Sequence, residues 1–227
     1  MYQHIPRGPW PHDLPDPRVQ RELQELNLRF VELVAAIAGQ PDRRAPENAV
    51  LGLDAAVASR IARLRPARRV ALARCPYSLH GISLEDSAFW ADAARGGGAE
   101  RYGPGRPTPE GALVTEVRDF LFLSLAWAWH LANVSPVAAR WMLGASSSAL
   151  ECLATLPFGS LRHLANDSPG LLHARLCDQR RFWSDLVTAT ESGSRQARFA
   201  AVSLGLQLSA AAGMRRAPGQ APTVGRR

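Results

Sequence analysis

The pattern of apolar and polar positions begins with one long amphipathic segment. Between Pro17 and Gly39, apolar residues recur in alternating steps of four and three, and glutamate and arginine residues lie between them. This spacing places a continuous apolar stripe on one helical face, and Gly39 followed by Pro41 is typical of a helix end. The stripe fits either the core of the chain or a surface that pairs with another helix. Its members are Val19, Leu23, Leu26, Phe30, Leu33 and Ile37.

Two short helices are predicted to follow, after a loop over residues 40–48. Asp54 is suited to cap a helix over residues 55–64, and Pro66 is suited to the first turn of the next helix, which ends near Ala73. A helix, a brief turn and a second helix are compatible with helix-turn-helix docking on DNA.

The stretch "CPYSLHGISLED" comes directly after these two helices and alternates weakly between apolar and polar residues. Gly81 interrupts the alternation, so the pattern allows no more than a short strand. The following "SAFWADAA" supplies aromatic cover and closes a first helical unit.

The pattern restarts after a segment rich in glycine and proline, where we expect an apolar helix over residues 113–132 and a short loop with Pro136. The stretch "LGASSSALECLATL" then matches "LGLDAAVASRIARL", which lies 92 residues earlier. Further on, Phe182-Trp183 follows Phe89-Trp90 at a distance of 93 residues. Because two landmarks recur at nearly one offset, the sequence predicts the duplication of a small helical unit.

The expected fold is therefore all-α, with two related small helical units, each holding a helix-turn-helix-like element and room for one short strand. An irregular arm occupies residues 1–17, the first unit residues 18–94, and a Gly/Pro-rich linker residues 95–110. The second unit spans residues 111–190, and residues 191–227 hold a C-terminal helix and a basic tail that we expect to be disordered.

The charge of the chain favours an acidic partner. The formal net charge is +7 and the sequence pI about 10.5, and nucleic acid is the commonest partner of such a chain. All 27 basic residues are arginine. An arginine-only composition is also typical of a GC-rich genome, so a solvated arginine face is the alternative interpretation.

Arginine is most concentrated in the two short helices of the first unit. Clustered guanidinium groups neutralise phosphates, and arginine also makes bidentate contacts to guanine. The equivalent helix of the second unit holds only Arg162 and His163, so we expect that unit to be structural or to serve assembly. Arginines from Arg195 onward could add nonspecific affinity from a flexible arm. The predicted DNA contacts are Arg60, Arg63, Arg65, Arg68, Arg69 and Arg74.

The sequence shows no signature of an enzyme or a metal site. It lacks a Gly-rich phosphate loop, a nucleophile elbow and paired histidines on a helix, and its six histidines are scattered. Three irregularly spaced cysteines argue against a disulfide framework and favour a reducing cytoplasm. The apolar run over residues 120–132 is too short to span a bilayer. We therefore expect a cytoplasmic protein without catalysis, cofactor, metal or membrane contact.

Two stretches, "LNLRFVELVAAIAG" and "AVLGLDAAVASRIARLRPARRVALARCPYSLHGISLED", carry a family resemblance. They resemble FlhD, the small subunit of the bacterial flagellar master regulator, and the FlhD-like activators of integrative and conjugative elements. The shared order is an amphipathic helix opening with Asn-Leu, a Leu-Gly start, a helix ending in leucine, Leu-Ala and a short apolar alternation. The resemblance covers residues 26–90 and, more weakly, residues 113–186.

This resemblance implies a mainly helical fold, helix-mediated self-association and a transcription activator that works with a larger, zinc-containing FlhC-type subunit. Two departures stand out. FlhD is a single short unit, whereas this chain holds two in tandem, so one chain could replace a dimer. The cysteine of the FlhD intersubunit disulfide has no match, because His80 falls near its position and Cys75 lies five residues earlier.

The expected function is a DNA-binding transcription activator of the FlhD-like type, with DNA and an FlhC-like subunit as partners and self-association into an oligomer. The alternative is an interaction, scaffold or adaptor protein without DNA contact, which oligomerises through its apolar helices. The predicted partner or dimer interface comprises Val19, Leu23, Leu26, Phe30, Leu33, Ile37, Phe120, Leu123, Trp127 and Leu131.

Overall fold

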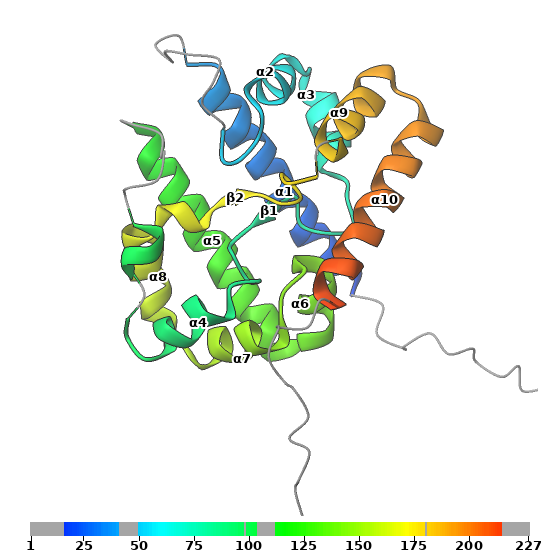
Figure 1. The fold of residues 1–227 in the computed structure, drawn as a ribbon. Coiled ribbons are helices and arrows are strands. Elements are labelled where there is room, and N and C mark those ends of the chain that lie inside the picture. The colour runs from blue at the N-terminus through cyan, green and yellow to red at the C-terminus, as the bar shows by residue number, and fades with distance from the viewer. Residues whose placement is uncertain (1–15, 41–49, 98, 104–111, 180, 215–227) are drawn as a thin grey trace, which may run out of the picture.

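The computed structural model describes residues 16–40, 50–97, 99–103, 112–179 and 181–214. Within these ranges the chain forms ten α-helices and one small antiparallel sheet of two strands (Figure 1). The predicted all-α class, with one short strand in each half, is confirmed.

In the first half of the chain, two helices begin at the capping residue or proline that the sequence predicted for them. Asp54 accepts hydrogen bonds from the backbone N–H groups of Ala56 and Val57, and Pro66 occupies the first turn of the next helix, where no N–H is needed. The elements are α1 (Pro17–Ala38), α2 (Ala55–Arg63), α3 (Pro66–Ala73), β1 (His80–Gly81) and α4 (Ser87–Ala94).

The second half repeats this order and adds two helices, α6 and α10. The short loop predicted around Pro136 is a helix instead, because Pro136 fits a first turn and Ala139 and Met142 are buried. The elements are α5 (Ala112–Val134), α6 (Pro136–Leu143), α7 (Ser147–Thr155), α8 (Phe158–Asp167), η2 (Pro169–Leu171), β2 (His173–Ala174), α9 (Phe182–Ser192) and α10 (Arg195–Met214).

The segment predicted as a linker is partly structured. The short 3-10 helix η1 (Ala99–Tyr102) lies within it. Tyr102 is buried, and its ring packs edge-on against Phe89 at a centroid distance of 4.9 Å. Most of the predicted arm and basic tail, and residues 98 and 104–110 of the linker, lie outside the described residues.

Equivalent segments of the two halves adopt the same local structure. Ser83 and Leu176, which stand 93 residues apart, both have a positive φ, 53° and 58°. The indole N–H of Trp90 donates to the carbonyl of Ser83, and that of Trp183 donates to the carbonyl of Arg175. The recurring tryptophans therefore connect the helix that follows each strand, α4 or α9, to the backbone directly after that strand.

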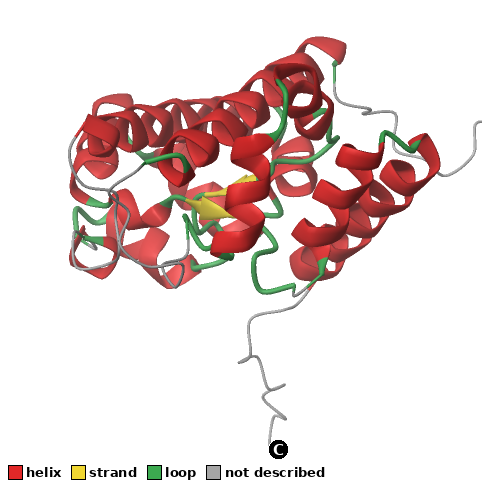
Figure 2. Cartoon of the chain, turned by 90° about the horizontal axis from the view of Figure 1, so that it is seen from above, coloured by secondary structure: helices red, strands yellow, loops and turns green. Residues whose placement is uncertain are grey.

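The two halves interlock at the centre of the molecule. β1 pairs antiparallel with β2, so that His80 lies opposite Ala174 and Gly81 opposite His173 (Figure 2). The helix α4 packs on α7 of the other half, and α9 packs on α2 and α3. Each half thus packs the helix that follows its strand, α4 or α9, on the other half, as a two-fold rotation would arrange them, and one core joins both.

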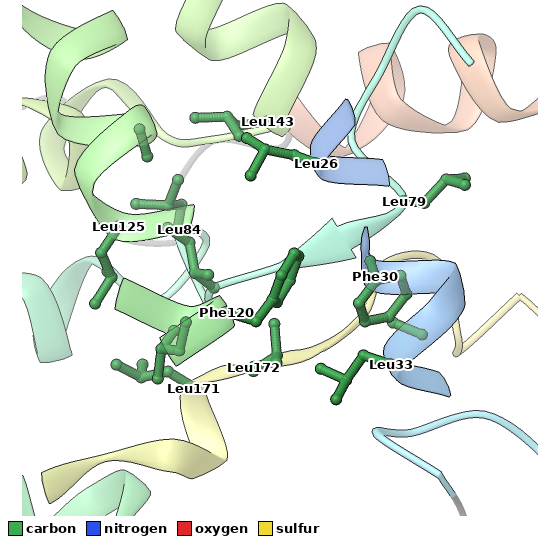
Figure 3. Close-up of a cluster of buried hydrophobic side chains, with 14 of the residues drawn as sticks. Leu26, Phe30, Leu33, Leu79, Leu84, Phe120, Leu125, Leu143, Leu171 and Leu172 are labelled. Atoms are coloured by element: carbon green, nitrogen blue, oxygen red, sulfur yellow. The ribbon is translucent and has the colours of Figure 1, made fainter. Parts of the chain in front are cut away.

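The amphipathic stripe of α1 forms the middle of that core. Phe30 and Phe120 lie 5.9 Å apart between ring centroids, and Leu26 and Leu33 lie on the same side of α1 (Figure 3). Burying a side chain of this size stabilises a protein by about 1.5–3 kcal/mol. Since Phe30 lies on α1 and Phe120 on α5, this stripe packs α1 against α5 of the same chain.

This packing corrects the predicted partner interface. Only Leu123 is exposed, while Val19 and Trp127 are half-buried, and the indole of Trp127 donates to Glu22 on α1. The other predicted interface residues pair helices within one chain and are not exposed to a partner; they are Leu23, Leu26, Phe30, Leu33, Ile37, Phe120 and Leu131.

Candidate nucleic-acid interface

The six arginines predicted to contact DNA lie on α2, on α3 and beside them, a region that we call the α2–α3 corner (residues 60–74). Leu64 and Arg65 connect the two helices, and Leu64 is buried. Four of the arginines are exposed, and no described residue forms a hydrogen bond or an ion pair with their guanidinium groups. These four are Arg63, Arg65, Arg68 and Arg74.

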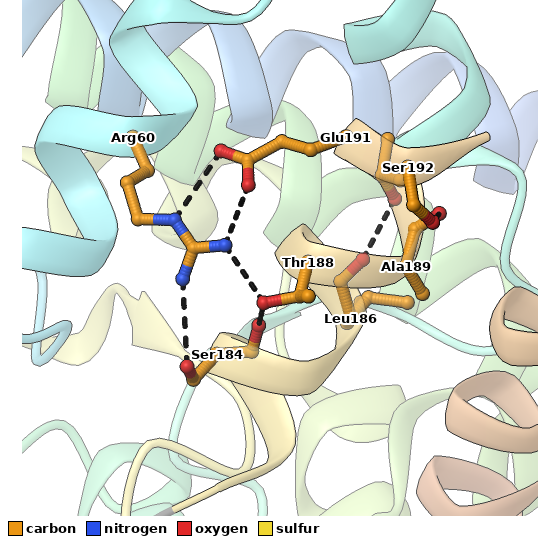
Figure 4. Close-up of polar contacts among 8 residues, drawn as sticks. Arg60, Ser184, Leu186, Thr188, Ala189, Glu191 and Ser192 are labelled. Carbon is orange, nitrogen blue, oxygen red and sulfur yellow. Dashed lines mark hydrogen bonds and ion pairs between the residues drawn. The ribbon is translucent and has the colours of Figure 1, made fainter. Parts of the chain in front are cut away.

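Arg60 does not fit the predicted role, because its guanidinium group is engaged by α9 (Figure 4). It donates from Nε and Nη2 to the two carboxylate oxygens of Glu191, at 3.2 and 2.6 Å. A further bond from Nη2 reaches Thr188 at 2.8 Å. The bond from Arg60 lowers the pKa of Glu191. Arg60 therefore connects α2 to α9 and is not free to bind a phosphate.

Arg69 is half-buried and also bonds within the chain. Its Nη2 donates to the carbonyl of Ala62 on α2 at 2.7 Å, which closes the turn between α2 and α3. The sequence could not separate these two arginines from the exposed ones, because the separation depends on which backbone and side-chain groups the fold brings near them.

Two arginines that the sequence assigned to a flexible arm lie in a helix that packs beside this corner. Arg198 on α10 donates from Nη1 to the carbonyl of Ala71 on α3 at 2.7 Å. Arg195 is exposed at the first position of α10. Sequence spacing offers no signal for this contact, because 127 residues separate Arg198 from Ala71.

The corresponding corner of the second half, α7–α8, has a different surface. Its Arg162 pairs with Asp119 at 2.9 Å and lies 4.0 Å above the ring of Phe122. Phe158 begins α8 and is half exposed. This corner therefore presents an aromatic side chain and a paired arginine, where the α2–α3 corner presents unpaired ones.

A double-mutant cycle on the Arg60–Glu191 pair is expected to give a small coupling energy. The two side chains are 25% and 40% exposed, so water screens their attraction and the coupling should be about 0.5–1 kcal/mol. Urea unfolding of Arg60→Ala, Glu191→Ala and the double variant measures it, and the Arg162–Asp119 pair is the matched control. A coupling energy above about 2 kcal/mol would contradict this reasoning.

A second polar group lies at the centre of the molecule and is closed to solvent. Arg175 is buried and donates to the carbonyls of Met142 at 2.8 Å and Ser78 at 3.5 Å. Burial lowers its pKa to about 10. Since these two bonds go to backbone carbonyls of both halves, we interpret Arg175 as a structural connection.

Other kinds of site find no support in the part of the chain that the structure describes. No group of three or more His, Cys, Asp or Glu residues there could hold a metal ion. None of its helices combines the length and the apolar character needed to span a bilayer. In comparisons with known proteins, no family model, no curated protein and no solved structure matches this chain.

Proposed function

We propose that this chain is a DNA-binding transcription regulator, an activator of the FlhD-like type that acts in the cytoplasm with an FlhC-like subunit. The observation that carries the proposal is the exposed set of guanidinium groups at the α2–α3 corner. Arg63, Arg65 and Arg68 have no hydrogen bond or ion pair with any described residue. Neighbouring like charges repel, and a row of phosphates relieves that repulsion.

The positive charge of the chain supports nonspecific affinity for DNA. Each phosphate that arginine neutralises releases counterions from the duplex and steepens the salt dependence of binding by about 0.9. The formal net charge of +7 favours approach to a polyanion. Base contacts, and therefore the choice of promoter, require groups beyond these phosphate contacts.

The interlocked halves also agree with the resemblance to FlhD. That family associates through helices, and here α1 and α5 pack together within one chain while α4 and α9 cross between the halves. A single chain can thereby supply the paired arrangement for which an FlhD-like protein needs two. The FlhC-like subunit would add further DNA contact.

Fluorescence anisotropy of a labelled 30-base-pair duplex, titrated between 50 and 200 mM salt, tests the proposal. We expect the triple variant R63A/R65A/R68A to lose three phosphate contacts, so its salt slope should fall by about 2.7. Affinity falls by some factor when the salt is raised from 50 to 200 mM. For the triple variant this factor should be about 40 times smaller than for the wild type.

The matched control for this titration is Arg162→Ala, at the corresponding corner of the second half. Because Arg162 is paired with Asp119, its removal should leave the salt slope unchanged. An unchanged slope for the triple variant, with and without the partner subunit, would reject the α2–α3 corner as the interface.

The second candidate function is a scaffold or adaptor without DNA contact. The observation in its favour is a set of exposed apolar side chains on α6 and α10, two helices that pack on each other. Val137, Trp141 and Phe199 are 48%, 51% and 75% exposed. This candidate predicts a stable oligomer whose mass, measured by light scattering, is indifferent to added duplex.

A further inference from the structure

We infer that the DNA-binding surface is built from both halves of the chain, and that Arg195 is a further phosphate-contacting residue on it. The inference rests on the proposed function and extends it to the α9–α10 corner (residues 191–198). This corner lies beyond the predicted second unit, in the segment predicted to hold a C-terminal helix and a basic tail.

Contacts between the two corners fix them relative to each other. Arg60 joins α2 to Glu191 at the end of α9, and Arg198 joins α10 to the carbonyl of Ala71 on α3. Both bonds cross between segments more than 120 residues apart in the sequence. Because α2 and α3 are tied to the last turn of α9 and the first turn of α10, these helix ends form one continuous surface.

Arg68 reaches across to the same place from α3. A Cβ atom built on Gly193 would lie 2.7 Å from Nη1 of Arg68, so the guanidinium group rests directly against the backbone of this glycine. Gly193 has a φ of 74°, which glycine adopts without strain. A side chain at this position would push Arg68 away from the α9–α10 corner.

Arg195 follows Gly193 by two residues, so its Cα lies within about 7 Å of the Gly193 Cα. It is exposed and forms no hydrogen bond or ion pair with a described residue. Glu191 is the one acidic residue of the α9–α10 corner, and Arg60 already pairs with it. The positive charge of Arg195 therefore adds to that of Arg68 on one surface.

Among the residues that the structure describes, the second half does not repeat this surface. The corner of the second half that corresponds to α2–α3 pairs Arg162 with Asp119, and the end of α4, the counterpart of α9, pairs Arg95 with Asp92. DNA would accordingly meet the molecule at one end, where α9 packs against both α3 and α10 and Arg198 of α10 reaches the carbonyl of Ala71 on α3.

The test is the same salt titration, applied to Arg195→Ala, Arg68→Ala and the double variant. We expect each single variant to lower the salt slope by about 0.9 and the double variant by about 1.8. For Arg195→Ala the loss of affinity between 50 and 200 mM salt should be about 3.5-fold smaller than for the wild type, equally on unrelated duplexes.

The matched control is Arg181→Ala. Arg181 is also exposed but precedes α9, about 16 Å of helix away from the α9–α10 corner, and its removal should leave the slope unchanged. If R63A/R65A/R68A lowers the slope and Arg195→Ala does not, the extension to α10 is overturned while the proposed function stands. If the wild type itself does not bind the duplex, with or without the partner subunit, both are overturned.

Discussion

Replacing Asn27 by alanine is expected to lower the free energy of unfolding by about 3–5 kcal/mol. Asn27 is fully buried on α1. Its Nδ2 donates to the carbonyls of Ala73 at 3.2 Å and Tyr77 at 3.0 Å, and its Oδ1 accepts from the N–H of Leu79 at 2.8 Å. The Asn27 side chain thus forms three hydrogen bonds with the backbone of the segment that leads from the end of α3 into β1.

The size of the effect follows from what alanine would leave behind. The carbonyl of Ala73 keeps a second bond, from the N–H of Cys75, but among the described residues only Asn27 bonds to the carbonyl of Tyr77 and the N–H of Leu79. A buried polar backbone group without a partner costs about 1–3 kcal/mol. Asn27→Leu should be as harmful, because a larger apolar side chain restores neither bond.

Urea unfolding followed by tryptophan fluorescence measures this loss, and Asn133→Ala is the matched control. Asn133 is an exposed asparagine on α5 whose Nδ2 donates to the carbonyl of Trp129, one turn earlier in the same helix. Its removal should change stability by no more than about 0.5 kcal/mol. A loss below about 1 kcal/mol for Asn27→Ala would show that the segment after α3 finds other partners.

The position of Asn27 also shows how much the sequence could predict. It stands four residues after Leu23 and three before Phe30, so it lies on the apolar stripe that correctly located α1. Periodicity therefore indicates that Asn27 faces the core. Its bonding partners stand 46 to 52 residues away, and no pattern along the chain indicates which backbone segment the fold places there.

Similar reasoning applies to the candidate site. Composition and spacing located the arginines of the α2–α3 corner, since charge can be counted in a sequence. Whether a guanidinium group is free depends on tertiary neighbours, and Glu191, which engages Arg60, lies 131 residues further on. The same limit explains why Arg195 was assigned to a flexible arm.

The recurring Phe-Trp motif indicated two units but not how they combine. Within one unit, α4 follows β1 closely, and a separate domain would pack it on its own α2. In the structure α4 packs on α7 and α9 packs on α2 and α3. An amphipathic pattern predicts that one face of a helix is buried, but it does not indicate which of two similar helices covers that face.

Acid is expected to destabilise the protein through His80, at the centre of the joined halves. The ring is buried, bonds through Nδ1 to the hydroxyl of Ser78 at 3.0 Å, and packs edge-on against Phe120. Burial, together with the positive charge of Arg175 and the nearby His173, lowers its pKa from 6.5 to about 3. The folded protein therefore holds His80 neutral at any pH well above 3.

The unfolded chain can protonate His80 below pH 6.5, whereas the folded chain cannot until the pH approaches 3. Between these values the free energy of unfolding should fall by about 1.4 kcal/mol per pH unit from this group, or about 3 kcal/mol between pH 6.5 and pH 4. Urea unfolding over this range measures the slope. His80→Gln should remove that part of it, and replacing the exposed His130 by glutamine should not. Parallel pH profiles for the wild type and His80→Gln would contradict the assignment, because a neutral amide at this buried position has no proton to take up.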